Sequence, residues 1–262
     1  MLEPGGFNKR GLSPRTVRYT HAVLHKALGQ AVKWRMTGQN VATLIDLPKQ
    51  RKKEMKALSE EEATRFLAAA KADKYHVLFA LLLGTGLRPG EAPGLKWADF
   101  DPAKRSLRVQ RVWARGDSGH KFQQPKTAKS RRNVELPAGL IRLLLAHCEQ
   151  QPANELDLMF ASEAGTPLNE RNVTTRHFKK ILERAGLPED VRLYDLRHTH
   201  ATLLLIAGTH PKIVSERLGH ATVTLTLDTY SHVLPGMQSD SAQQLDAMLF
   251  KPSEAEATTR YN

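Results

Sequence analysis

The chain has 262 residues, of which 40% are hydrophobic and 25% charged, a balance typical of a folded globular protein rather than a disordered one. No apolar run is long enough to cross a membrane, and the first residues lack the apolar core of a secretion signal. A single cysteine, Cys148, excludes an intramolecular disulfide framework and any cysteine-based zinc site. We therefore expect a cytoplasmic protein without a membrane partner, built as one large domain or two modest ones.

The basic charge is concentrated near the N-terminus. Residues 1–56 hold 12 Lys and Arg against 3 Asp and Glu, which is +9 of the total net charge of +12. Such a segment is typical of a partner for a polyanion, because Lys and Arg displace the counterions of phosphates. A solubilising tail or an exposed helix face would have the same composition, so charge alone leaves both interpretations open.

A basic helix is predicted from Ser13 to about Met36, because Ser13 and Pro14 are a typical helix start and apolar residues follow at helical spacing. It could lie across a nucleic-acid backbone or simply be a solvated helix packed on one side. The Pro- and Lys-rich segment after it predicts a linker. The candidate DNA-binding residues of the helix and linker are Arg15, Arg18, Lys26, Lys33, Arg35, Lys52 and Lys53.

The rest of the chain changes from helical to β-rich patterns and back. Ser59 and Glu62 form a capping box at the start of a helix that runs to about Lys71, and another helix covers 75–83. Short alternating runs over 105–136 predict a three-stranded antiparallel sheet. Further helices are expected over 138–150, 170–185, 195–207, 211–218, 223–230 and 238–250.

These elements predict a mainly α fold with a small three-stranded antiparallel sheet, an α+β class. We assign residues 1–50 to a helical DNA-binding segment, 51–58 to a linker, 59–250 to a catalytic domain and 251–262 to a flexible tail.

Several common kinds of site are not supported by the sequence. The histidine pairs lack the spacing of a helical zinc site, and the GTGLRPGE word lacks the GK[ST] ending of a phosphate loop. No serine lies in a GxSxG word. Cys148, within an apolar helix, is expected to be a buried, inert thiol. We therefore expect neither a metal nor a cofactor.

Four polar residues stand where predicted helices begin or end: Arg88, Arg197, His220 and Tyr230. Two guanidinium groups suit a phosphodiester, since each makes paired hydrogen bonds to its oxygens and keeps its charge. Clustered cations would also favour ionisation and attack by a tyrosine hydroxyl, which is otherwise a poor nucleophile. Each residue also has a structural interpretation. Arg88 could pair with Glu91, Arg197 with Asp195, His220 could cap a helix and Tyr230 could lie in the core.

Taken together, the words around these residues resemble the tyrosine recombinase (phage integrase) family. TGLRPGEAPGLKWADFD resembles its first arginine box, LYDLRHTHATLLLIAGTHPKIVSERLGHATVTLTLDTYSHV its second, and PKTAKSRRNVELP its β-hairpin lysine segment. The resemblance covers about Leu12 to Leu249. It implies the recombinase catalytic fold, site-specific DNA cleavage and rejoining without metal or nucleotide, and a homotetramer on double-stranded DNA, with accessory DNA-bending proteins in some members.

The resemblance also implies a role for each matched residue. Arg88 and Arg197 would hold the scissile phosphate, and His220 would hydrogen-bond a non-bridging oxygen. Tyr230 would attack and form a 3′-phosphotyrosyl link. Lys126 would protonate the leaving 5′-oxygen, with Lys129 a weaker candidate. Glu91 would brace Arg88.

Three features depart from the family pattern. Tyr194 stands where the HxxR word usually begins with histidine, and a tyrosine is no base at neutral pH without a large pKa shift, so we expect altered proton handling. Pro93 falls in the helix expected to begin at Pro89. The segment before the catalytic domain supplies only the last two helices of the usual core-binding domain. A catalytically weak DNA-binding remnant is therefore the alternative to an active recombinase, and a type IB topoisomerase shares the chemistry.

Overall fold

A computed structural model describes residues 11–50, 55–116, 119–125, 130–230 and 237–250. The chain divides into two compact units between Glu54 and Met55. Within the described residues, no helix is long and apolar enough to cross a membrane. The predicted residues Lys52, Lys53, Lys126 and Lys129 lie outside the described ranges.

The first unit consists of one long helix and a short one. Helix α1 (Pro14–Lys33) begins as the sequence predicts, since the Ser13 side chain accepts a hydrogen bond from the Thr16 amide at 3.2 Å. It ends three residues earlier than expected, and Arg35 adopts a left-handed conformation with φ +58°. A 3₁₀ helix (Val41–Leu44) packs against α1, and His21 Nε2 lies 2.7 Å from the Ala42 carbonyl oxygen. No residue of α1 itself is buried.

The second unit is built on a buried central helix. Helix α2 (Glu60–Ala70) has the predicted capping box between Ser59 and Glu62. Helix α3 (His76–Thr85) is apolar on all sides, as expected of a helix surrounded by protein, and packs against α2 and two later helices. Gly86 ends α3 with φ +66°, a conformation that glycine adopts without steric cost.

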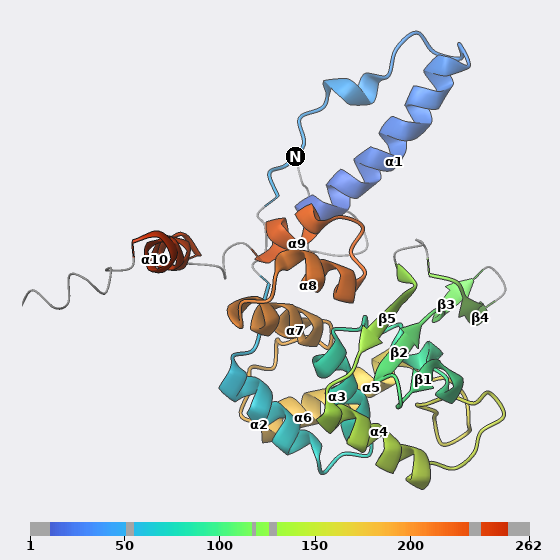
Figure 1. Ribbon diagram of the computed structural model, residues 1–262. Coiled ribbons are helices and arrows are strands. Elements are labelled where there is room, and N and C mark those ends of the chain that lie inside the picture. The colour runs from blue at the N-terminus through green and yellow to red at the C-terminus, as the bar shows by residue number, and fades with distance from the viewer. Residues whose placement is uncertain (1–10, 51–54, 117–118, 126–129, 231–236, 251–262) are drawn as a thin grey trace, which may run out of the picture. The chain divides into compact units, whose positions relative to one another are not determined.

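The β-rich region forms two sheets rather than the single sheet expected over 105–136 (Figure 1). Strands β1 (Phe100–Asp101), β2 (Ser106–Val109) and β5 (Arg132–Glu135) pair antiparallel in the order β1-β2-β5, with Leu107 opposite Val134. Strands β3 (Val112–Gly116) and β4 (Gly119–Gln123) form a separate hairpin.

The first part of the region expected to form one sheet is interrupted at Gln110 and Arg111, between β2 and β3. Gln110 Nε2 donates to a carboxylate oxygen of Asp99 at 2.5 Å, and Arg111 forms an ion pair with the same buried carboxylate. These two residues leave the ladder to satisfy Asp99, since a buried carboxylate without partners is costly. The expectation of one continuous sheet was therefore wrong, although a three-stranded antiparallel sheet is present.

The remaining helices match the expected ranges closely. They are α4 (Ala138–Gln150), α5 (Glu170–Val173), α6 (Lys179–Arg184), α7 (Asp195–Ile206), α8 (Pro211–Leu218), α9 (Val223–Tyr230) and α10 (Met237–Leu249). A π-helical turn (Thr174–Phe178) joins α5 to α6 within the single helix expected over 170–185. Cys148 is exposed on α4, which corrects the expectation of a buried thiol.

An aromatic cluster joins α2, α3 and the π-helical turn. The ring centroids of Phe66, Phe79 and Phe178 lie 5.5–6.0 Å apart, and all three side chains are fully buried. Helix α3 also packs on α7, and α7 packs on α8. This core fixes the C-terminal end of α3 beside the start of α7. The structure confirms the predicted mainly α class with small antiparallel sheets.

Candidate active site

Arg88 lies in a tight turn just after α3. Its backbone amide donates to Glu91 Oε2 at 2.9 Å and its Nη1 donates to Glu91 Oε1 at 2.9 Å. The helix expected to begin at Pro89 is absent from this fully described segment. Pro93 instead belongs to a short 3₁₀ helix (Ala92–Gly94), where no α-helical hydrogen bond is lost to it.

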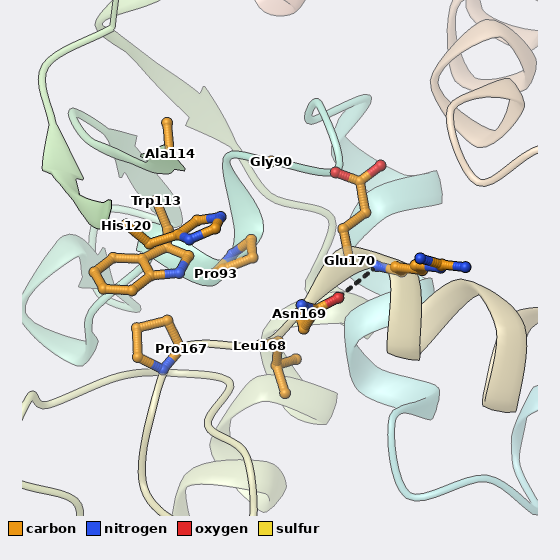
Figure 2. A pocket seen from close by; sticks show the side chains of 10 residues that line it. Gly90, Pro93, Trp113, Ala114, His120, Pro167, Leu168, Asn169 and Glu170 are labelled. Atoms are coloured by element: carbon orange, nitrogen blue, oxygen red, sulfur yellow. Dashed lines mark hydrogen bonds between the residues drawn. The ribbon is translucent and has the colours of Figure 1, made fainter. Parts of the chain in front are cut away.

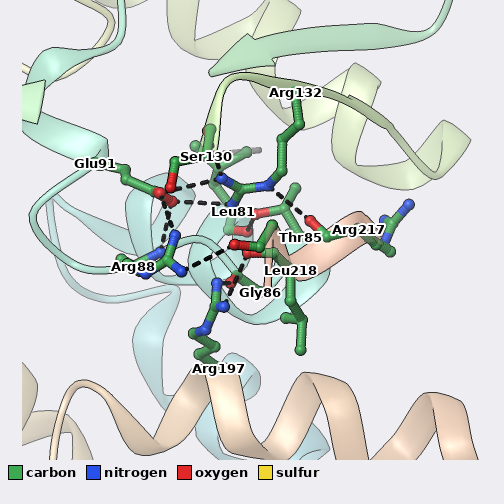
Figure 3. Close-up of polar contacts among 11 residues, drawn as sticks. Leu81, Thr85, Gly86, Arg88, Glu91, Ser130, Arg132, Arg197, Arg217 and Leu218 are labelled. Atoms are coloured by element: carbon green, nitrogen blue, oxygen red, sulfur yellow. Dashed lines mark hydrogen bonds and ion pairs between the residues drawn. The ribbon is translucent and has the colours of Figure 1, made fainter. Parts of the chain in front are cut away.

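Glu91 is the buried carboxylate that organises this corner of the site (Figure 3). Arg132, at the start of β5, donates to both of its oxygens at 3.0 Å, and Arg88 pairs with it from the other side. Burial alone would raise the pKa of Glu91, but the hydrogen bonds and charges of Arg132 and Arg88 hold that pKa below its usual value. Glu91 is therefore an ionised anchor for two arginines, which fits the bracing role predicted for it.

Arg197 is held in the first turn of α7 and is 1% exposed. Its Nη1 donates to the Gly86 carbonyl at 2.7 Å and its Nη2 to the Leu218 carbonyl at 2.8 Å. In the described part of the chain, Asp195 forms its ion pair with Arg192, at 2.7 Å. The alternative interpretation, in which Arg197 would pair with Asp195, was therefore wrong. Burial and the neighbouring Arg88 cation lower the pKa of Arg197 to about 10, which still leaves it charged at neutral pH.

Arg88 and Arg197 converge on the end of α8. Arg88 Nη2 donates to the Gly219 carbonyl at 3.2 Å, one residue beyond the carbonyl that Arg197 binds. Figure 3 shows Arg88, Arg132 and Arg197 approaching one another from three separate elements. Two of these guanidinium groups, those of Arg88 and Arg132, bind the Glu91 carboxylate, and the third, that of Arg197, binds backbone carbonyls, so the corner keeps an excess of positive charge. Such an arrangement suits an anion with several oxygens, such as a phosphodiester. We call the site formed by Arg88, Arg132, Arg197 and Glu91 the anion corner.

His220 follows the left-handed Gly219 that ends α8. Its Nδ1 lies 2.7 Å from the Thr226 hydroxyl on α9, and its backbone amide donates to the Ser215 carbonyl at 3.0 Å. Burial, followed by the charges of Arg197 and Arg88, lowers the pKa of His220 to about 4. The ring is therefore neutral at pH 7 and can donate one hydrogen bond without adding charge.

Tyr230 ends α9 and is 2% exposed. Its hydroxyl lies 2.7 Å from Nδ1 of His198, the residue that follows Arg197 on α7. Burial raises the pKa of Tyr230, while the Arg197 charge acts in the opposite direction. Tyr194, just before α7, is 40% exposed, and its ring meets the His198 ring edge-on at 5.1 Å. Helix α7 thus carries Arg197, which belongs to the anion corner, and next to it His198, which contacts the Tyr230 hydroxyl.

Sequence reasoning missed four residues of this region. Arg132 and His198 make the contacts given above, and Arg217 Nε donates to His200 Nε2 at 3.0 Å. His200 Nδ1 in turn lies 2.8 Å from the Leu83 carbonyl, and its pKa falls to about 3, chiefly through burial. The double arginine in SRRNVELP and the repeated histidines in RHTHAT were the available signals.

Five of the predicted DNA-binding residues lie in the described part of the first unit, and all five are exposed: Arg15, Arg18, Lys26, Lys33 and Arg35. Arg18 Nη1 donates to the Pro48 carbonyl at 3.3 Å. Their binding role stays a prediction, as do the roles of the catalytic candidates.

A separate cavity of about 360 Å³ lies between the β3–β4 hairpin and the start of α5 (Figure 2). Trp113 and His120 of the hairpin stack with ring centroids 6.1 Å apart on one side, and Pro167 and Glu170 line the other. None of the predicted catalytic residues that the structure describes lines it. Across the described ranges, no group of three or more His, Cys, Asp or Glu side chains is placed to hold a metal ion.

Comparison with known proteins identifies the family. Residues 56–236 match the phage integrase family. The chain is 36% identical over 214 residues to "Tyrosine recombinase XerC-like" of Caldanaerobacter subterraneus subsp. tengcongensis, covering 74% of this chain and 54% of that protein. It is 30% identical over 250 residues to the ICEBs1 integrase of Bacillus subtilis, covering 91% of this chain and 67% of that one. The chain thus spans between about half and two thirds of these relatives.

Solved structures agree on the fold. A variant of the Tn1549 transposon integrase, in complex with a circular intermediate DNA, superposes with a TM-score of 0.79 at 22% identity, over 90% of this chain and 80% of that one. XerA recombinase superposes with a TM-score of 0.55 at 22% identity, over 92% and 85%. The resemblance drawn from the two arginine boxes is confirmed, and the chain belongs to the phage integrase family.

Proposed function

We propose that the protein is a tyrosine-type site-specific DNA recombinase that integrates or excises a phage or other mobile element through a 3′-phosphotyrosyl intermediate. The observation that carries this proposal is the construction of α7. Arg197 binds the carbonyls of Gly86 and Leu218 beside Arg88, and the next residue, His198, contacts the hydroxyl of Tyr230. The anion corner and the nucleophile are therefore joined by one rigid element.

In the proposed reaction, Arg88 and Arg197 exchange carbonyl partners for the non-bridging oxygens of the scissile phosphate. Their charges oppose the negative charge that develops on those oxygens in the transition state. His220, neutral and positioned through Thr226, donates a further hydrogen bond. Glu91 keeps Arg88 in place through their ion pair.

The covalent step exchanges one phosphate ester for another. The Tyr230 oxygen bonds to phosphorus as the bond to the 5′-oxygen breaks, and Lys126, with Lys129 the weaker candidate, protonates that leaving oxygen. The ester to Tyr230 retains the energy of the broken bond, so rejoining by another 5′-hydroxyl needs neither a nucleotide nor a metal.

The partner of this reaction is double-stranded DNA, on which we expect a homotetramer and, in some reactions, accessory DNA-bending proteins. The surface arginines and lysines of α1, joined by Lys52 and Lys53, would contact phosphates without reading sequence. The Tn1549 integrase, solved with DNA, and the similarity to XerC-like and integrase relatives support this assignment. We also expect the protein to act in the cytoplasm.

The test uses a supercoiled plasmid that carries the DNA flanking the gene of this protein, incubated with the purified chain in EDTA and stopped with SDS. We expect protein covalently attached to DNA, together with relaxed plasmid, and neither product with Tyr230→Phe. Plasmids without the flanking DNA separate a recombinase from a topoisomerase, which would relax both. A native gel shift without any adduct would refute the recombinase and leave a DNA-binding remnant.

A further inference from the structure

Resting on the proposed function, we propose that His198 is the proton acceptor for Tyr230 during strand cleavage and returns the proton during rejoining. The family pattern that this chain resembles begins its HxxR word with histidine, and Tyr194 occupies that place here. The structure shows a histidine four residues further along the chain, on α7, in direct contact with the nucleophile candidate.

The geometry suits a proton transfer. His198 Nδ1 and the Tyr230 hydroxyl oxygen are 2.7 Å apart, the usual separation for a short hydrogen bond between such groups. The two rings are tilted by 56° with centroids 5.8 Å apart, so they meet through their polar atoms rather than by stacking. His198 is 7% exposed and Tyr230 2% exposed, which keeps bulk water from competing for that proton.

Tyr194 is not placed to do the same work. Its contact with the pair is an edge-on packing of its ring against the His198 ring, at 5.1 Å between centroids. A neutral phenol is also no acceptor for the proton of another phenol at neutral pH. Tyr194, at the position where the family pattern has histidine, therefore supports His198 by packing against its ring from one helical turn away.

Burial, more than the neighbouring charges, keeps the His198 ring neutral. Burial lowers the pKa of His198 to about 4; the Asp195 carboxylate acts against this, and Arg192 and Arg197 add to it. With its remaining proton on Nε2, the ring presents the Nδ1 lone pair to the Tyr230 hydroxyl. Burial also raises the pKa of Tyr230, so the proton stays on oxygen until the phosphate is bound.

As the Tyr230 oxygen bonds to phosphorus, its proton passes to His198 Nδ1 and the ring becomes an imidazolium. The bond from phosphorus to the 5′-oxygen breaks, and that oxygen takes a separate proton, which Lys126 would supply. In rejoining, a 5′-hydroxyl attacks phosphorus and passes its proton to the neutral amine of Lys126. The bond from phosphorus to the Tyr230 oxygen breaks, and the imidazolium returns its proton to that oxygen. The net proton count of the protein is unchanged over a full cycle of cleavage and rejoining.

The test compares His198→Asn with the wild type on a DNA substrate cleaved at the mapped site. Asparagine places an oxygen near the position of Nδ1, so it preserves a hydrogen bond to Tyr230 but accepts no proton. We expect single-turnover cleavage at pH 7 to fall by about 10² to 10⁴-fold. The residual rate should rise with pH, while the wild-type rate stays flat between pH 6 and 8. A misfolded fraction would lower the amplitude of cleavage and not its pH dependence.

A second substrate separates the acceptor from the donor. A 5′-bridging sulfur at the scissile phosphate leaves without protonation, so it should restore Lys126→Ala and leave His198→Asn slow. Tyr194→Phe should keep the flat pH profile of the wild type on both substrates. The proposal is overturned if His198→Asn cleaves within about fivefold of the wild type with a flat profile, if sulfur restores it, or if Tyr194→Phe alone acquires the pH dependence. Absence of any wild-type adduct would instead refute the recombinase function itself.

Discussion

Replacing Glu91 by glutamine tests whether this buried carboxylate holds the anion corner together. The change keeps the size of the side chain but removes its charge and presents an amide NH₂ to two arginines. Arg132 is the more affected partner, because its side chain is only 6% exposed, compared with 33% for Arg88. Removing one member of a buried ion pair typically costs about 3–5 kcal/mol, since it leaves the other charge uncompensated. We expect Glu91→Gln to lower the free energy of unfolding by about that amount.

The matched control is Glu163→Gln, which removes the carboxylate of an exposed pair with Lys74. An exposed ion pair contributes little to stability, because water screens the two charges. Urea unfolding followed by circular dichroism at pH 7.5 measures both variants, and a loss of about 4 kcal/mol lowers the midpoint by about 1–2 M. The double variant Glu91→Gln/Arg132→Met should recover part of the loss, because no buried charge then remains unpaired there. Equal urea midpoints for Glu91→Gln and Glu163→Gln would refute this reasoning.

Three further predictions concern the same corner. Gly86→Ala should destabilise the fold much more than Gly208→Ala does. Both positions have a positive φ, but a Cβ at Gly86 would lie 2.6 Å from His200 Cδ2, whereas a Cβ at Gly208 would meet no such neighbour. Equal unfolding midpoints for the two variants would contradict this prediction. Acid should destabilise the protein, because His198 and His200 have pKa values of about 4 and about 3 and stay neutral in the fold, whereas the same histidines in the unfolded chain bind protons below about pH 6.5. Each histidine should lower the free energy of unfolding by about 2 kcal/mol at pH 5. A melting temperature that is constant from pH 7.5 to 5 would disprove this prediction. Arg197→Lys should reduce DNA cleavage by about 10²-fold or more with little change in a native gel shift, since an ammonium cannot reach two carbonyls or phosphate oxygens in a planar fork; cleavage at the wild-type rate would exclude the fork as the reason for arginine.

Local features of the fold were predictable from sequence because they depend on neighbouring residues. The capping box at Ser59 and the start of α1 at Ser13 involve contacts within three residues, and both are present. The division into two sheets was not predictable, since it depends on Asp99 drawing Gln110 and Arg111 out of the strand from more than ten residues away.

The candidate site divides in the same way. Arg88, Arg197, His220 and Tyr230 were predicted because they stand in recognisable sequence motifs. The structure places Arg88 in the turn after α3, Arg197 on α7, His220 just after α8 and Tyr230 on α9. Arg132 and His198 were missed because their partners, Glu91 and Tyr230, are 41 and 32 residues away along the chain. A pattern of residue types carries no information on which distant groups meet, so only the folded chain could reveal these contacts.

In the proposed reaction, Tyr230 and no other residue attacks the DNA phosphate. Mass spectrometry of the adduct, after digestion with nuclease and trypsin, tests this most directly. We expect a nucleotide attached through its 3′-phosphate to the peptide that contains Tyr230, and a 5′-hydroxyl on the released DNA end. A nucleotide on the peptide that contains Tyr194, or a 5′-phosphate on the released end, would contradict it.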